Sequence, residues 1–268
     1  MAHASLLACV LTTAAALFTA DAGGAEQTLY FAHDDERLLL DNQRHGGAAF
    51  FSTAGGHDRA LPLIVFLHGT NEAGELHLWM GGGKRDLRPL ASDLVANRKA
   101  PPFVLAAPSQ TRAAGVPRAL WEGFDLARFV GDVARATAGR VAIDGSRVVV
   151  IGHSGAGCNP TGGLAGAASS SSVPAFIVSV DPCLDAEMGG VFARRPSSVP
   201  LSVWWQSAVW ARSPDRFWAA LTAKKPTGRV DRMTKLPVRG ADAHDAIVPL
   251  VLERVASSMP FEAAKPSK

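Results

Sequence analysis

The sequence lacks a strong excess of either charge, long basic runs and metal-ligand spacings. Its 27 Lys and Arg residues nearly balance 24 Asp and Glu residues, which gives a net charge of +3. With little aromatic interleaving as well, the chain is not expected to bind nucleic acid. Its histidines have no His-Glu-x-x-His or comparable spacing, so we expect no metal. Gly152, Gly155 and Gly157 do not fit the Gly-x-Gly-x-x-Gly pattern of dinucleotide sites, and we expect no cofactor.

Long apolar runs are also scarce, and the first one has, on its C-terminal side, the flanking residues of a secretory signal peptide. The stretch from Leu6 to Phe18 is followed by small residues and predicts a secretory signal peptide over residues 1–25, cut near residues 22–25. No later apolar run is long enough to span a membrane. No Lys or Arg precedes the apolar stretch, so a buried N-terminal helix is the alternative interpretation. We expect a secreted or periplasmic protein with no membrane span in its mature form.

The remaining residues, 26–268, are expected to form a single domain. The chain is 47% hydrophobic and 19% charged, which is a globular composition. Of its three cysteines, Cys9 would be lost with the signal peptide, which leaves Cys158 and Cys183. Both follow predicted strands, and neighbouring strands would bring them within disulfide range. We predict this disulfide, which suits an exported protein; two buried free thiols are the alternative.

Strand and helix patterns alternate along most of the chain. Apolar runs predict strands over residues 29–32, 38–40, 48–53, 61–67, 103–107, 148–151, 175–180, 201–205 and 233–238. Helical spacing or composition predicts helices over 89–98, 123–138, 160–168 and 246–257. The alternation predicts an α/β fold with a mostly parallel central sheet, an antiparallel opening and helices on both faces. Ligands of such sheets bind beyond the carboxyl ends of the strands.

One serine stands where a buried strand runs into a turn of small residues. The apolar run Val148 to Ile151 is followed by Gly152-His153-Ser154-Gly155-Ala156. This segment resembles the nucleophile elbow of the α/β-hydrolase family, in which small neighbours allow the sharp turn that exposes the serine. Ala156 departs from the pattern, because Gly is common at that position. The alternative interpretation is a glycine-rich turn with a structural serine.

The resemblance implies an α/β-hydrolase fold and roles for further residues. His68-Gly69 after the strand 61–67 is similar to the start of the family's oxyanion loop, which makes the N–H groups of Thr70 and Gly155 the expected oxyanion donors. His244, in a loop before the last helix, is the expected base, and the order serine, acid, histidine matches the family.

Two aspartates compete for the role of the acid. Asp181 directly follows the strand 175–180 and resembles the acid of pancreatic-type lipases. Asp215 follows the next strand, as in most α/β-hydrolases, but Ser213-Pro214-Asp215-Arg216 also has the pattern of a helix start. We favour Asp181, with Asp215 as the alternative and Asp242 as a weaker third candidate.

Two tryptophans are candidate substrate contacts. Trp79 lies in a loop region over 76–88, and Trp210 follows the strand 201–205. For Trp79 the alternative is a surface loop without function, and for Trp210 it is burial in the core. The resemblance implies a serine hydrolase that forms an acyl-enzyme on Ser154, with a small-molecule or acyl-bearing substrate. A carboxylic ester is the favoured substrate; an amidase or peptidase with the same triad, or a secreted non-catalytic binding protein, are the alternatives.

Overall fold

A computed structural model describes residues 26–33, 46–52, 59–81, 85–110, 116–170, 174–210, 213–223 and 226–258. The predicted signal peptide over residues 1–25 and the predicted strand over 38–40 lie outside these ranges. In the part of the chain that is described, no helix is both long and apolar enough to cross a membrane.

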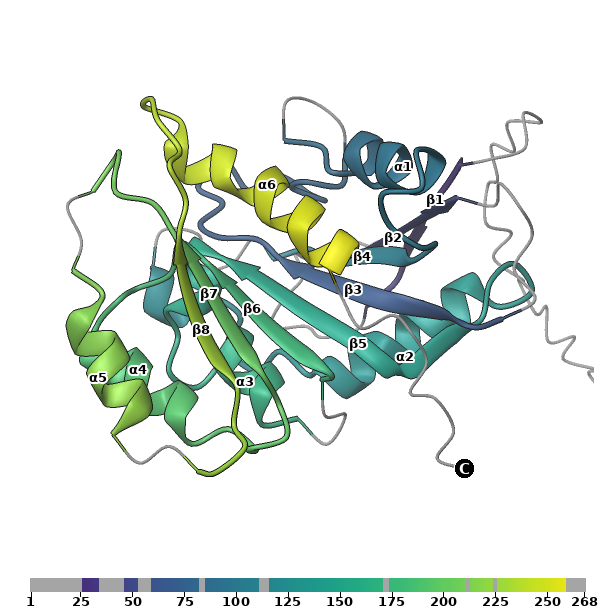
Figure 1. The fold of residues 1–268 in the computed structure, drawn as a ribbon. Coiled ribbons are helices and arrows are strands. Elements are labelled where there is room, and N and C mark those ends of the chain that lie inside the picture. Colours follow the sequence, from purple (N-terminus) through teal and green to yellow (C-terminus); the bar gives the residue numbers. More distant parts are fainter. Residues whose placement is uncertain are drawn as a thin grey trace, which may run out of the picture.

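The described strands form one twisted, mostly parallel sheet (Figure 1). The strands are β1 (Glu26–Phe31), β2 (Gly47–Ser52), β3 (Leu61–Leu67), β4 (Val104–Pro108), β5 (Ile143–His153), β6 (Phe176–Val180), β7 (Leu201–Trp205) and β8 (Asp231–Lys235). Their order across the sheet is β1-β2-β4-β3-β5-β6-β7-β8. β2 pairs antiparallel with both β1 and β4, and every other pairing is parallel. The predicted antiparallel opening and parallel centre are therefore confirmed.

Helices cover both faces of the sheet, as predicted. α1 (Arg88–Ala96) and α6 (Ala243–Ser258) lie on one face, and α2 (Leu126–Thr137), α3 (Gly163–Ala168), α4 (Ala186–Ala193) and α5 (Asp215–Thr222) lie on the other (Figure 1). Successive side chains of a strand point to opposite faces. Val150 of β5 accordingly packs with the α2 side, whereas Val149 packs with the α6 side. This two-sided burial explains why the central strands are apolar throughout.

Two helix predictions need correction, and the strand predicted over 148–151 is longer, since β5 runs from Ile143 to His153. The last helix begins at Ala243 and not at residue 246, so His244 lies in the first turn of α6 and not in a loop before it. The predicted helix over 160–168 begins only at Gly163, because the Thr161 N–H donates to Asn159 Oδ1 in a turn and Gly162 is extended. A short 3-10 turn, η2 (Ser154–Gly157), follows β5. α4 was not predicted, and of α5 only the start pattern Ser213-Pro214-Asp215-Arg216 was recognised.

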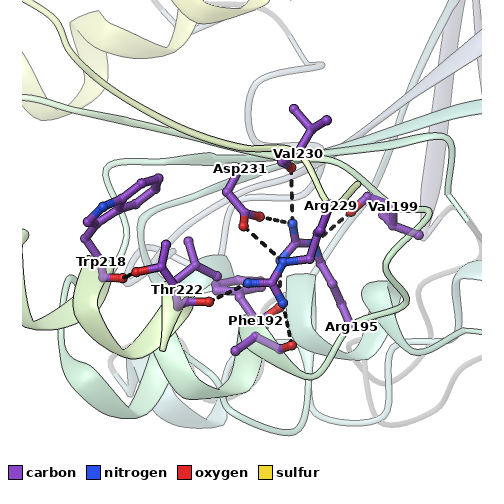
Figure 2. Close-up of polar contacts among 10 residues, drawn as sticks. Phe192, Arg195, Val199, Trp218, Thr222, Arg229, Val230 and Asp231 are labelled. Atoms are coloured by element: carbon purple, nitrogen blue, oxygen red, sulfur yellow. Dashed lines mark hydrogen bonds and ion pairs between the residues drawn. The ribbon is translucent and has the colours of Figure 1, made fainter. Parts of the chain in front are cut away.

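A buried charge cluster ties α4 and α5 to β8 (Figure 2). The Asp231 carboxylate at the start of β8 is ion-paired with both Arg195 and Arg229, and all three side chains are buried. Arg195 also donates to the carbonyl oxygens of Phe192 and Val199, at 2.7 and 2.8 Å. Arg229 donates to the carbonyls of Ala193 and Leu221, in the last turns of α4 and α5. The guanidinium groups thus satisfy carbonyls that a helix end leaves unpaired.

Candidate active site

Ser154 lies directly beyond the carboxyl end of β5, on a sharp turn. β5 ends at His153, and Ser154 begins η2 with a φ of 53°. A positive φ is uncommon for a residue other than glycine and is a strain often found at functional sites. The strand-to-turn geometry expected of a nucleophile elbow is therefore present around this serine.

The glycines beside Ser154 are needed because the turn is closely packed. A Cβ atom added to Gly152 would overlap Leu164, and one added to Gly155 would overlap Leu120. At Gly157 an added Cβ would lie 2.7 Å from both Pro182 Cβ and Ser179 Oγ. Ala156 stands where the family pattern commonly has Gly. Its methyl group is fully buried in the apolar core on the α2 side of the sheet.

Asp181 and His244 lie together beside this turn. Asp181 follows β6, and the β5–β6 register pairs His153 with Val180, so Ser154 and Asp181 follow adjacent strand positions. His244 Nδ1 donates a short hydrogen bond to Asp181 Oδ2. The Asp181 carboxylate is buried and the residue has a φ of 49°. Asp215, by contrast, is the first residue of α5 and accepts a hydrogen bond from Ser213 Oγ at 2.7 Å. Of the two main candidate acids, Asp181 is the one paired with His244.

Gln206, directly after β7, makes further contacts to the acid. Its side-chain Nε2 donates to Asp181 Oδ2 at 2.8 Å. Its Oε1 accepts from the backbone N–H groups of Ala208 and Val209, at 2.6 and 3.1 Å. One buried amide therefore orients the Asp181 carboxylate and holds the turn that follows β7.

His153, at the end of β5, contacts His244 through a hydrogen bond and through its ring. Its Nε2 donates to the backbone carbonyl oxygen of His244 at 2.9 Å, and the two ring centroids are 4.5 Å apart. Burial, together with the neighbouring His244, lowers the pKa of His153 to about 3. His153 is therefore neutral at pH 7 and acts as a hydrogen-bond donor that fixes the first turn of α6.

The predicted oxyanion loop lies against Ser154. A Cβ atom added to Gly69 would be 2.6 Å from Ser154 Cβ and 3.2 Å from its Oγ, so only glycine allows this approach. The buried His68 ring donates from Nδ1 to the Gly69 carbonyl oxygen at 2.8 Å and accepts at Nε2 from the Gln110 N–H at 3.1 Å. Burial lowers the pKa of His68 to about 4. Because the Gly69 carbonyl and the Thr70 N–H share one planar trans peptide, holding the carbonyl also fixes the direction of that N–H.

The two candidate tryptophans have different surroundings. Trp79 is only 4% exposed, and its ring packs edge-on to His153 at 5.7 Å. Trp79 therefore supports the site from within the core. Trp210 is 40% exposed, and its ring lies edge-on to His244 with centroids 4.4 Å apart. Trp210 thus contacts His244 and is also partly exposed to solvent.

The predicted disulfide between Cys158 and Cys183 is present, with Cα atoms 5.0 Å apart. Cys158 ends the η2 turn that begins at Ser154, and Cys183 lies two residues after Asp181. The Cys183 N–H also donates to Cys158 Sγ at 3.1 Å. The bond therefore joins the turn that carries the serine to the turn that carries the aspartate.

The sequence did not single out His153, Gln206 or the side chain of His68 as contributors to the site. His153 lies between Gly152 and Ser154 in the elbow segment, and Gln206 directly follows the end of β7. Their position at strand ends could have marked them as candidate site residues. Their hydrogen-bond partners, however, are far away in the chain, so the contacts could not be predicted. Within the described ranges, no group of three or more His, Cys, Asp or Glu residues could hold a metal ion.

In sequence, the chain matches no protein-family model and no curated protein. In fold it is similar to solved structures. A ferulic acid esterase has a TM-score of 0.57 at 13% identity, over 86% of this chain and 98% of that one. An S-formylglutathione hydrolase from Agrobacterium tumefaciens has a TM-score of 0.52 at 13% identity, over 87% and 95% of the two chains. The fluorophosphonate-binding serine hydrolase F of Staphylococcus aureus has a TM-score of 0.52 at 11% identity, over 88% and 98%.

Proposed function

We propose that this chain, which has the α/β-hydrolase fold, is a serine hydrolase that cleaves a carboxylic ester. The observation that carries the proposal is the hydrogen bond from His244 Nδ1 to the buried Asp181 carboxylate, beside a serine held at a positive φ. Nucleophile, base and orienting acid on neighbouring strand ends are the parts that serine acyl transfer needs. The esterases among the similar structures support an ester as the substrate.

The first half of the reaction forms an acyl-enzyme. Because Asp181 holds Nδ1 of His244, Nε2 is the nitrogen left to exchange protons. Nε2 takes the proton of Ser154 Oγ while Oγ bonds to the acyl carbon, and the carbonyl oxygen becomes an oxyanion. The N–H groups of Thr70 and Gly155 stabilise this oxyanion. The tetrahedral intermediate then breaks its bond to the alcohol oxygen, which receives the proton from His244.

The second half releases the acid. Water loses a proton to His244 Nε2 and attacks the acyl carbon; the bond to Ser154 Oγ then breaks, and Oγ recovers its proton. Asp181 remains a carboxylate throughout and stabilises the imidazolium that forms twice in the cycle. The hydrogen bond from Gln206 to Asp181 stabilises the charged form of that carboxylate.

Labelling with a fluorophosphonate probe tests the proposal. We expect the folded protein to be modified at Ser154 and the Ser154→Ala variant not to react, while Ser198→Ala, a change at an exposed serine, labels like the parent protein. Ester turnover should fall by about 10⁴-fold or more in Ser154→Ala, as for other triad serines. Peptide mass mapping identifies the modified residue.

The same preparation separates the rival interpretations. Hydrolysis of ethyl acetate and methyl ferulate, compared with the matching amides, distinguishes an esterase from an amidase. A correctly folded protein that neither labels nor hydrolyses would rule out the proposal and favour a binding protein.

We propose that the chain is exported. The disulfide between Cys158 and Cys183 supports an oxidising compartment, in agreement with the signal peptide predicted over residues 1–25. Mass determination of the mature N-terminus tests this, and an intact Met1 on the recovered protein would contradict it.

A further inference from the structure

The turn after β7 presents an aromatic side chain to His244. The His244 ring contacts the rings of His153 and Trp210; His153 is buried, whereas Trp210 is 40% exposed. Val209 beside it is 36% exposed, so the turn offers an apolar surface next to the site. An exposed tryptophan beside a reactive centre can bury a large apolar area of a ligand at low entropic cost.

This turn is fixed relative to the acid and is not a loosely attached loop. Gln206 accepts from the N–H groups of Ala208 and Val209 through Oε1 and donates to Asp181 through Nε2. The Gln206 side chain is completely buried. The position of Trp210 is therefore tied to the same carboxylate that orients His244.

The reaction chemistry places the alcohol half of the substrate beside His244. The alcohol must leave within reach of His244 Nε2, because that nitrogen supplies its proton. The carbonyl oxygen, in contrast, faces the Gly69–Thr70 loop. A group attached to the alcohol oxygen therefore lies next to the His244 ring, where Trp210 is exposed.

We propose that Trp210 determines specificity for the alcohol half of the substrate and favours esters of flat, ring-bearing alcohols. This inference rests on the proposed esterase function and adds the substrate group that the turn recognises. Stacking or edge-on contact with the indole ring favours an aromatic ring over a short alkyl group.

Two acetate esters test the assignment, because benzyl acetate and ethyl acetate form the same acetyl-enzyme and differ only in the alcohol. Deacylation is then common to both, and any discrimination arises during acylation. We expect Trp210→Ala to lower kcat/KM for benzyl acetate by about 10-fold relative to ethyl acetate. Trp218→Ala, a change at a tryptophan of α5 that is 36% exposed, should leave the ratio unchanged.

A second measurement does not depend on turnover. Benzyl alcohol should slow fluorophosphonate labelling of Ser154 in the parent protein and in Trp218→Ala, but not in Trp210→Ala. Equal losses for both esters, or unchanged protection by benzyl alcohol in Trp210→Ala, would overturn the assignment. Labelling of Ser154 at the parent rate in Trp210→Ala shows that the catalytic serine is intact. Absence of labelling in the parent protein would instead overturn the proposed function itself.

Discussion

At the scale of single residues, two buried histidines make the fold sensitive to acid. Burial lowers the pKa of His68 to about 4 and that of His153 to about 3, whereas a histidine in an unfolded chain titrates near 6.5. Between these values the unfolded chain binds more protons than the folded one. The free energy of unfolding must therefore fall as the pH falls below 6.5, and it is fully retained above that pH.

We expect each of these histidines to reduce the free energy of unfolding by about 2 kcal/mol between pH 7 and pH 5. Urea unfolding at the two pH values measures the loss. His153→Gln keeps a side-chain donor but removes the titrating group, so its loss between the two pH values should be smaller by about 2 kcal/mol. An identical loss in the variant and the parent protein would show that His153 does not titrate in this way.

The choice between Asp181 and Asp215 shows what sequence alone leaves open at this scale. Both aspartates follow a strand, and both precede His244 in the chain. The choice depends on contacts in the folded structure. His244 Nδ1 is hydrogen-bonded to Asp181, whereas Asp215 is the first residue of α5. Strand-end positions could be read from the sequence, but the pairing of side chains across the site could not.

At the scale of elements, α4 and α5 depend on a carboxylate at the start of β8. Asp231 is ion-paired with the buried guanidinium groups of both Arg195 and Arg229 (Figure 2). Burial already lowers the pKa of Arg195. Removing the carboxylate would leave two cationic groups buried without the counter-charge of Asp231.

We predict that Asp231→Asn lowers the free energy of unfolding by about 3–5 kcal/mol. Asp144→Asn is the matched control, because Asp144 pairs with Arg147 in a partly exposed position. The control should cost about 1 kcal/mol or less. Urea denaturation of both variants provides the comparison, and similar costs for the two would mean that the buried cluster contributes no more than a surface pair.

α4 was missed because its sequence argues against a helix. Gly189 and Gly190 lie in its interior, and glycine is unfavourable there. The structure gives the reason for one of them: a Cβ atom on Gly189 would overlap the carbonyl oxygen of Phe217 in α5. The glycine permits a close helix pair, which is a tertiary requirement. The strands 61–67 and 201–205, whose signal is local and apolar, were predicted with their observed bounds.

At the scale of the whole molecule, the disulfide joins the turns that carry Ser154 and Asp181. Cys158 and Cys183 are separated by 25 residues, and a closed loop of that size stabilises a fold by about 3 kcal/mol. We expect the Cys158→Ala/Cys183→Ala double variant to lose about this much in urea unfolding and to label more slowly with fluorophosphonate.

Reducing agent provides the control for this prediction. Dithiothreitol should destabilise the parent protein to the level of the double variant and should leave the double variant unchanged. If the double variant were as stable as the oxidised parent protein, the bond would contribute nothing to holding the two turns together.

The proposed base, His244, lies in the last described helix and is therefore made late in synthesis. Ribosomes make a chain from its N-terminus, and a domain generally folds as a unit. Ser154 and Asp181 emerge early, whereas α6 begins only at residue 243. A nascent chain that has been made only as far as β8 therefore contains the proposed nucleophile and acid but not the proposed base. In the proposed mechanism, ester hydrolysis therefore requires that the last helix be made and docked, because this helix carries the base.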